Sequence, residues 1–150
     1  MDLNGNVYDI NREDIKFVYR GTNLPQNIII ISATFHAIYG KKKAILEKIK
    51  KYLNKKKETQ PSQIKTCGST FKNPENKKAW ELIKNSNCAS AHFGKASISK
   101  KHCNFFVNEG GATSEDIENL INFVKNKVFD KYKIKLDLEL KIIGERTNNV

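Results

Sequence analysis

The stretch "NFFVNEGGATSEDIENLINFVKNKV", residues 104–128, contains the pattern that decides the fold. Its first part, 104–108, is typical of a strand, and the glycines of "EGGAT" predict a turn. Thr113 and Asp116 have the spacing of a capping box at the start of a helix. The apolar residues that follow have helical spacing: Ile117, Leu120, Ile121, Val124 and Val128. A strand, a turn and an amphipathic helix indicate mixed α and β structure.

Two more helices are expected upstream. In residues 41–57 the apolar positions form one stripe, and the lysines around it are typical of a solvated helix face: Ile45, Leu46, Ile49, Tyr52 and Leu53. A shorter helix is expected after Pro74, with four inner positions: Ala79, Trp80, Leu82 and Ile83.

Three further segments predict strands. Residues 27–40 begin with a β-branched run, which predicts a strand buried on both faces at its start. The Asn-Gly pair in residues 4–9 predicts the edge of a hairpin. In residues 134–142 apolar and charged residues alternate, so one face of this last strand should enter a core.

Length and composition limit the organisation. The 150 residues fit one domain, or one domain with a piece of another. Pro61, within residues 58–63, interrupts the pattern, so we expect a boundary between 1–58 and 59–150. The net charge of +11 suggests a nucleic-acid-binding protein as an alternative function, although the lysines are spread over almost every segment instead of one patch.

The cysteines indicate a reducing compartment. Cys67, Cys88 and Cys103 are an odd number at wide spacings without a Cys-x-x-Cys pair, so we expect reduced thiols in a cytoplasmic protein and no metal site. No apolar window of about 18 residues occurs, and the N-terminus has no signal-like apolar segment. We therefore expect neither a membrane-spanning nor an exported protein.

Several short motifs follow one another along the chain: "FVYRGTN" (17–23), "QP" (60–61), "GSTFKNP" (68–74), "AWELI" (79–83), "KKHCNFFVNEGGAT" (100–113) and "LELKIIGE" (138–145). The most specific of them is Gly-Ser-x-Phe-Lys-Asn-Pro. The order of these motifs resembles a known family, the UDP-N-acetylenolpyruvoylglucosamine reductases, and the resemblance covers nearly the whole chain as the C-terminal half of such an enzyme.

The resemblance implies three catalytic residues. Ser69 would protonate C2 of the enolpyruvyl group of UDP-N-acetylglucosamine enolpyruvate after hydride reaches C3 from the flavin. Arg20, and Glu139 of the last expected strand, would stabilise the developing enolate and orient its carboxylate. The guanidinium of Arg20 suits this role because it offers a fixed fork of hydrogen-bond donors. Arg20 and Gly68 are also expected to lie at the cofactor.

The resemblance also implies substrate contacts, namely Lys72, Asn73 and, more weakly, His102. Read from composition alone, Ser69 is a turn residue, Arg20 a surface charge, and Glu139 a member of a solvated row of charges.

The family layout implies an α+β substrate-binding domain at 59–150, preceded by part of the second FAD-binding lobe at 1–58. FAD and NADPH are the implied cofactors. Members hold FAD mainly through N-terminal lobes with a glycine-rich phosphate loop, and the pair Gly110-Gly111 does not match that loop. The resemblance thus leaves open a chain that works with a separate N-terminal FAD-binding polypeptide, or an inactive folded remnant.

Overall fold

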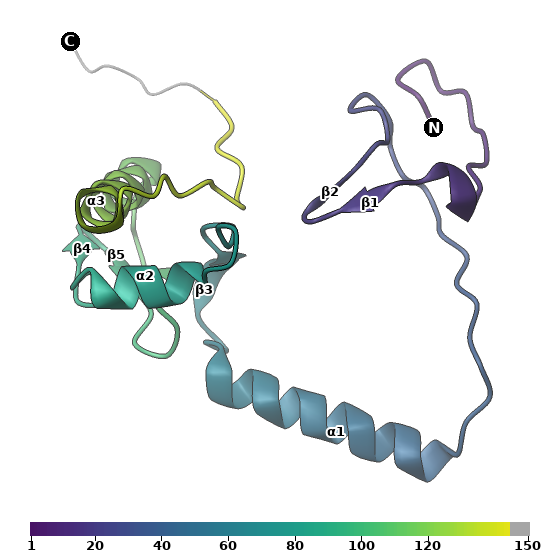
Figure 1. Ribbon diagram of the computed structural model, residues 1–150, viewed down its shortest axis with the longest axis horizontal. Coiled ribbons are helices and arrows are strands. Elements are labelled where there is room, and N and C mark those ends of the chain that lie inside the picture. The colour runs from purple at the N-terminus through teal and green to yellow at the C-terminus, as the bar shows by residue number, and fades with distance from the viewer. Residues whose placement is uncertain (145–150) are drawn as a thin grey trace. The chain divides into compact units, whose positions relative to one another are not determined.

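The computed structural model of the protein describes residues 1–144, so residues 145–150 of the expected substrate domain lie outside the described residues. The chain divides into two compact units, Met1–Lys42 and a second that begins at Lys43. This division falls at the start of the Lys-rich helix, whereas the sequence indicated a boundary after it, at 58–59. Most helices and strands of the chain are labelled in Figure 1.

The first unit contains little regular structure. A single 3-10 turn, η1 (Arg12–Asp14), precedes two short antiparallel strands, β1 (Phe17–Val18) and β2 (Gly21–Thr22).

The hairpin predicted at residues 4–9 is wrong. The Asn4-Gly5 turn is present, but the Asp2 carboxylate accepts the backbone N–H groups of Asn4 and Asn6, each at 2.9 Å. The Asp2 N–H also donates to the carbonyl of Asn6 at 3.0 Å, so the carboxylate and the backbone of one residue close a local turn in place of a strand ladder.

The strand predicted at residues 27–40 is also wrong. Ile28 forms an isolated bridge to Asp2, and the rest of this segment is irregular. Phe35 is 86% exposed and Ile38 is 87% exposed. A strand requires backbone partners. Ile29 exchanges two backbone hydrogen bonds with Met1, but within residues 1–144 no segment pairs with 30–40. The β-branched run therefore remains an exposed apolar segment.

The Lys-rich helix is confirmed as α1 (Lys42–Thr59). None of its residues is buried, and its apolar stripe stays about half exposed, with Ile45 at 46% and Leu53 at 54%. Its C-terminal end is held by the Lys101 ammonium, which donates to the carbonyl of Lys57 at 2.7 Å.

The second unit contains one four-stranded antiparallel sheet in the order β3-β6-β5-β4. Its strands are β3 (Lys65–Ser69), β4 (His92–Phe93), β5 (Ala96–Ile98) and β6 (Phe105–Asn108). Two helices, α2 (Ala79–Asn85) and α3 (Ser114–Tyr132), pack with this sheet (Figure 1). The predicted α+β class, the strand at 104–108 and the helices after Pro74 and Thr113 are confirmed.

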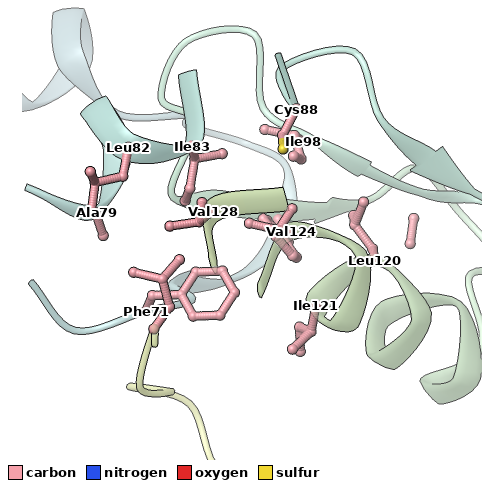
Figure 2. Packing of buried hydrophobic residues seen from close by; sticks show 13 residues of the cluster. Phe71, Ala79, Leu82, Ile83, Cys88, Ile98, Leu120, Ile121, Val124 and Val128 are labelled. Atoms are coloured by element: carbon pink, nitrogen blue, oxygen red, sulfur yellow. The ribbon is translucent and has the colours of Figure 1, made fainter. Parts of the chain in front are cut away.

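One hydrophobic core joins these helices to the sheet, as the close view in Figure 2 shows. The apolar stripe of α3 supplies four fully buried residues, while Trp80 of α2 lies only half-buried. Phe71 lies among these side chains, and its ring meets that of Phe106 edge to face at 5.8 Å. The labelled core residues are Phe71, Ala79, Leu82, Ile83, Cys88, Ile98, Leu120, Ile121, Val124 and Val128.

The capping box at the start of α3 is confirmed. The Thr113 hydroxyl accepts the Asp116 N–H at 3.1 Å, and the Asp116 carboxylate accepts the Thr113 N–H at 2.9 Å. We expect Thr113→Ala to lower the free energy of unfolding by about 1 kcal/mol, because the Asp116 N–H loses its side-chain acceptor while the bond from the residue 113 N–H to the Asp116 carboxylate can remain. Urea denaturation measures this loss, and Ser114→Ala at the next, exposed position is the control. Equal effects of the two substitutions would contradict a capping role for Thr113.

The strand predicted at 134–142 is reduced to one bridge, Leu138 to Phe71. Leu136 is buried as the alternation requires, but Ile142 is 50% exposed. Beyond Glu139 this segment has no strand partner among residues 1–144, so the ladder ends there despite the regular sequence pattern.

Candidate functional site

Ser69 is the last residue of β3 and lies directly after a β-bulge. The register between β3 and β6 shifts between Thr66 and Ser69, and Gly68 has a φ of +84°. Only glycine adopts this conformation readily, and bulges commonly redirect the residue that follows. A Cβ added at Gly68 would meet no atom within 4 Å, so the space beside this backbone is open.

Glu139 lies beside the Ser69 motif through the backbone. The Glu139 N–H donates to the carbonyl of Thr70 at 2.9 Å, and the Lys72 N–H donates to the carbonyl of Asp137 at 2.9 Å. These two bonds flank the bridge between Phe71 and Leu138. The fold therefore brings Glu139 next to the residue that follows Ser69, although the two are distant in sequence.

Asn73 has a structural role that the sequence did not suggest. Its side-chain oxygen accepts the N–H of Ala79, the first residue of α2, at 3.0 Å. Lys78 is the N-cap of this helix but makes no side-chain cap bond, so Asn73 supplies the acceptor from outside the helix. Asn73 itself is exposed and Lys72 is half-buried, so both expected substrate contacts remain accessible.

His102 is half-buried near two aromatic rings. Its centroid lies 4.8 Å from that of Phe105 and 6.3 Å from that of Trp80. The Asn104 N–H lies 3.3 Å from Nδ1 of His102, so a neutral ring accepts there and keeps its proton on Nε2. Burial lowers the pKa of His102 below its ordinary value.

This lowered pKa predicts a pH-dependent loss of stability. Because the folded chain binds a proton at His102 less readily than the unfolded chain, its stability is full above the unfolded pKa. The stability falls as the pH drops below about 6.5 towards the folded pKa. We expect His102→Gln to reduce the slope of unfolding free energy against pH in this window, as measured by urea denaturation at several pH values. His92→Gln, at an exposed position on β4, is the control. An unchanged slope in the His102 variant would contradict this assignment.

Arg20 lies in the first unit. It occupies the turn between β1 and β2 with a left-handed φ of 55°, unusual for a residue other than glycine or asparagine. Its guanidinium carbon lies 5.5 Å from the centre of the Tyr19 ring, and its side chain is exposed.

The three cysteines lie in different surroundings. Cys88 is buried and Cys103 half-buried, and burial raises the pKa of both thiols. Cys67 is exposed on β3.

No helix within residues 1–144 has the length and apolar character needed to span a bilayer.

Sequence reasoning missed Asn104. This buried residue accepts the Thr70 N–H with its backbone carbonyl at 2.8 Å, and its side-chain amide bonds to both backbone groups of Phe71. One signal for it is present in the sequence, an asparagine directly before an apolar strand. Polar residues at such positions need internal hydrogen-bond partners.

Known proteins support the resemblance. The curated relatives include the UDP-N-acetylenolpyruvoylglucosamine reductase of Rickettsia prowazekii, 43% identical over 145 residues, covering 97% of this chain and 49% of the relative. That of a Wolbachia strain from Drosophila simulans is 42% identical over 140 residues, covering 93% and 48%. The solved reductase from Thermus caldophilus aligns with a TM-score of 0.75 and 30% identity over 86% of this chain and 46% of that one. The chain therefore spans about half the length of these relatives.

The family model for the C-terminal domain of UDP-N-acetylenolpyruvoylglucosamine reductase matches residues 60–143, which is more than half of the 150 residues. The matched region includes Ser69, together with Asn104 and Glu139, which both bond the backbone of the next residue, Thr70. The chain belongs to the family of UDP-N-acetylenolpyruvoylglucosamine reductases.

Proposed function

We propose that the chain is the substrate-binding half of a reductase that converts UDP-N-acetylglucosamine enolpyruvate to UDP-N-acetylmuramate for peptidoglycan synthesis. The observation that carries this proposal is the pairing of the motif with the C-terminal segment, in which the Glu139 N–H bonds the carbonyl of Thr70. Two residues that the family resemblance assigns to one reaction thereby lie in adjacent backbone segments.

In this proposal Ser69 supplies a proton to C2 of the enolpyruvyl group. A serine hydroxyl is a weak acid, so it serves only where nearby donors stabilise its conjugate base or relay a proton. Glu139 and Arg20 orient the substrate carboxylate and stabilise charge that develops there. Lys72 and Asn73 contact the substrate near the motif, and His102 contributes its Nε2–H as a neutral donor.

The space beside Gly68 fits the approach of a flat cofactor. An added Cβ there would have no neighbour within 4 Å, and the bulge exposes backbone next to Ser69. FAD, when bound, supplies the hydride for C3 of the substrate and regains it from NADPH. On this chain, Gly68 and Arg20 are the residues proposed to face the cofactor.

A separate polypeptide of the N-terminal FAD-binding kind is the proposed partner. Most of the exposed large apolar side chains in residues 1–144 fall within residues 3–53, including Phe35, Ile38 and the stripe of α1. In each unit taken by itself, exposed apolar side chains that lie together usually mark an interaction site. The relatives are about twice as long, and their further half is the kind of partner that we propose for these side chains.

The test combines this chain with the separately expressed N-terminal half of the Rickettsia prowazekii reductase. We expect NADPH oxidation that depends on UDP-N-acetylglucosamine enolpyruvate and requires both polypeptides. A mixture that binds FAD but oxidises NADPH at the same rate with and without the sugar substrate would contradict the proposed function. The same mixture with the Ser69→Ala chain controls for oxidation that bypasses the site.

A further inference from the structure

The backbone of Phe71 has an unusual partner. Its N–H donates to the side-chain oxygen of Asn104 at 3.0 Å, and its carbonyl accepts from the side-chain nitrogen of Asn104 at 2.8 Å. In an antiparallel sheet a residue exchanges this pair of bonds with the backbone of the residue opposite. Phe105, the first residue of β6, pairs with Ser69, so β6 does not extend beside Phe71, and there the Asn104 amide takes the place of a strand residue.

The other edge of the motif is held by different groups. The carbonyl of Thr70 and the N–H of Lys72 bond the C-terminal segment at Glu139 and Asp137. In an extended strand the polar groups of successive residues point to opposite edges, so those of Phe71 face away from this segment. Both hydrogen bonds that hold Phe71 at its remaining edge come from one side chain.

Asn104 is buried and makes hydrogen bonds with both its side chain and its backbone. It is 4% exposed, its two side-chain bonds are buried, and its backbone carbonyl also accepts the Thr70 N–H at 2.8 Å. A buried amide with all these partners holds one geometry, because leaving any of the paired groups unsatisfied is costly. The residues it holds, Thr70 and Phe71, lie between Ser69 on one side and Lys72 on the other.

We propose that Asn104 is a positioning residue of the reductase, which fixes the backbone between Ser69 and Asn73 so that the motif faces the substrate in one conformation. The expected effect of Asn104 on the reaction rests on the proposed function, whereas its effect on the backbone conformation of the motif does not. Asn104 acts through Phe71 and the motif, without touching the substrate itself.

Amide hydrogen exchange of the 150-residue chain, followed by NMR, tests the structural part. In Asn104→Ala we expect the Phe71 amide to exchange about tenfold to a hundredfold faster, since a buried hydrogen bond is lost. Asn108→Ala is the matched control, because Asn108 lies at the other end of β6 and holds Gly110 and Ala112 instead. Unchanged exchange of the Phe71 amide in a folded Asn104→Ala chain would overturn the proposal.

A second variant separates the two bonds. Asn104→Asp keeps an oxygen for the Phe71 N–H but loses the donor for the Phe71 carbonyl. We therefore expect the Phe71 N–H to stay nearly as protected from exchange as in the unmodified chain. The Phe71 carbonyl, however, loses the hydrogen bond from the side chain of residue 104. If Asn104→Ala does not fold, the flavin reoxidation rate of the Asn104→Asp chain decides the positioning role, because a rate equal to that of the unmodified chain would overturn it.

The catalytic part is tested with the chain combined with an N-terminal FAD-binding half. In both Asn104 variants we expect reoxidation of the flavin by UDP-N-acetylglucosamine enolpyruvate to slow by about tenfold to a hundredfold, because small displacements of reacting groups are costly. Flavin reduction by NADPH should be unchanged, and Asn108→Ala should alter neither step. Reoxidation at the unmodified rate would overturn the positioning role. If the unmodified chain itself shows no reoxidation, the proposed function fails, and the exchange of the Phe71 amide alone decides whether Asn104 holds the motif.

Discussion

Replacing Ser69 with alanine is expected to slow reoxidation of the flavin by UDP-N-acetylglucosamine enolpyruvate by about 10²- to 10⁴-fold, the usual contribution of a positioned acid. The substitution removes the hydroxyl proposed to protonate C2 and leaves the bulge at Gly68 in place. Flavin reduction by NADPH does not involve this proton, so its rate should remain nearly unchanged. Stopped-flow absorbance of the flavin in the combined enzyme measures the two half-reactions separately.

The matched control for Ser69 is Ser97→Ala on β5, whose hydroxyl donates to the carboxylate of Glu109 at 2.6 Å. This substitution removes a hydroxyl from the same sheet and should alter neither half-reaction. Equal slowing of both half-reactions by Ser69→Ala would show a general disturbance and remove the acid role from Ser69.

Replacing Leu120 with alanine is expected to lower the free energy of unfolding by about 2–5 kcal/mol. Leu120 lies on α3 with no exposed surface, in the core shared by α2, α3 and the sheet (Figure 2). Its loss removes apolar contacts and leaves a cavity, because packed neighbours relax only partly. Urea denaturation of the 150-residue chain, monitored by circular dichroism, measures the change.

Leu46→Ala on α1 is the control for Leu120→Ala. Leu46 also belongs to a helical apolar stripe, but it is 55% exposed. We expect its replacement to change the stability of the isolated chain by no more than about 0.5 kcal/mol. A loss at Leu46 as large as that at Leu120 would contradict an unpacked stripe on α1.

The core of the second unit could be predicted from the sequence because its signals are local. The capping box of Thr113 and Asp116 and the stripe that follows sit within one helix, and both fix that helix without reference to distant residues. The strand at 105–108 has a local signal as well, since its contiguous apolar run is buried and supplies Phe106 to the same core.

The predictions of two long strands were wrong for one physical reason. Residues 27–40 and 134–142 have strong β patterns, but a pattern specifies only which side chains face a core, not whether a backbone partner exists. Ile28 and Leu138 are where single bridges form, and the ladder goes no further in either case. Strand pairing depends on distant segments, so the sequence of one strand alone could not predict its absence.

The residues of the candidate site also differ in whether their signals are local in the sequence. The motif around Ser69 is contiguous and could be predicted from the sequence, whereas the Asn104 amide reaches Phe71 across 33 positions of the chain. The helix-capping role of Asn73 likewise depends on where α2 begins, which is several residues later than Pro74 suggested. Residues that act by holding a backbone leave little trace in local sequence.

Binding of FAD tests the proposed function most directly, namely that this chain supplies the substrate-binding half of a flavin site that also needs an N-terminal FAD-binding half. FAD fluorescence is titrated with the purified 150-residue chain, with the N-terminal half of the Rickettsia prowazekii reductase, and with both together. The account predicts tight, stoichiometric quenching only when both polypeptides are present. Tight binding by this chain alone, or the absence of binding by the mixture, would contradict it.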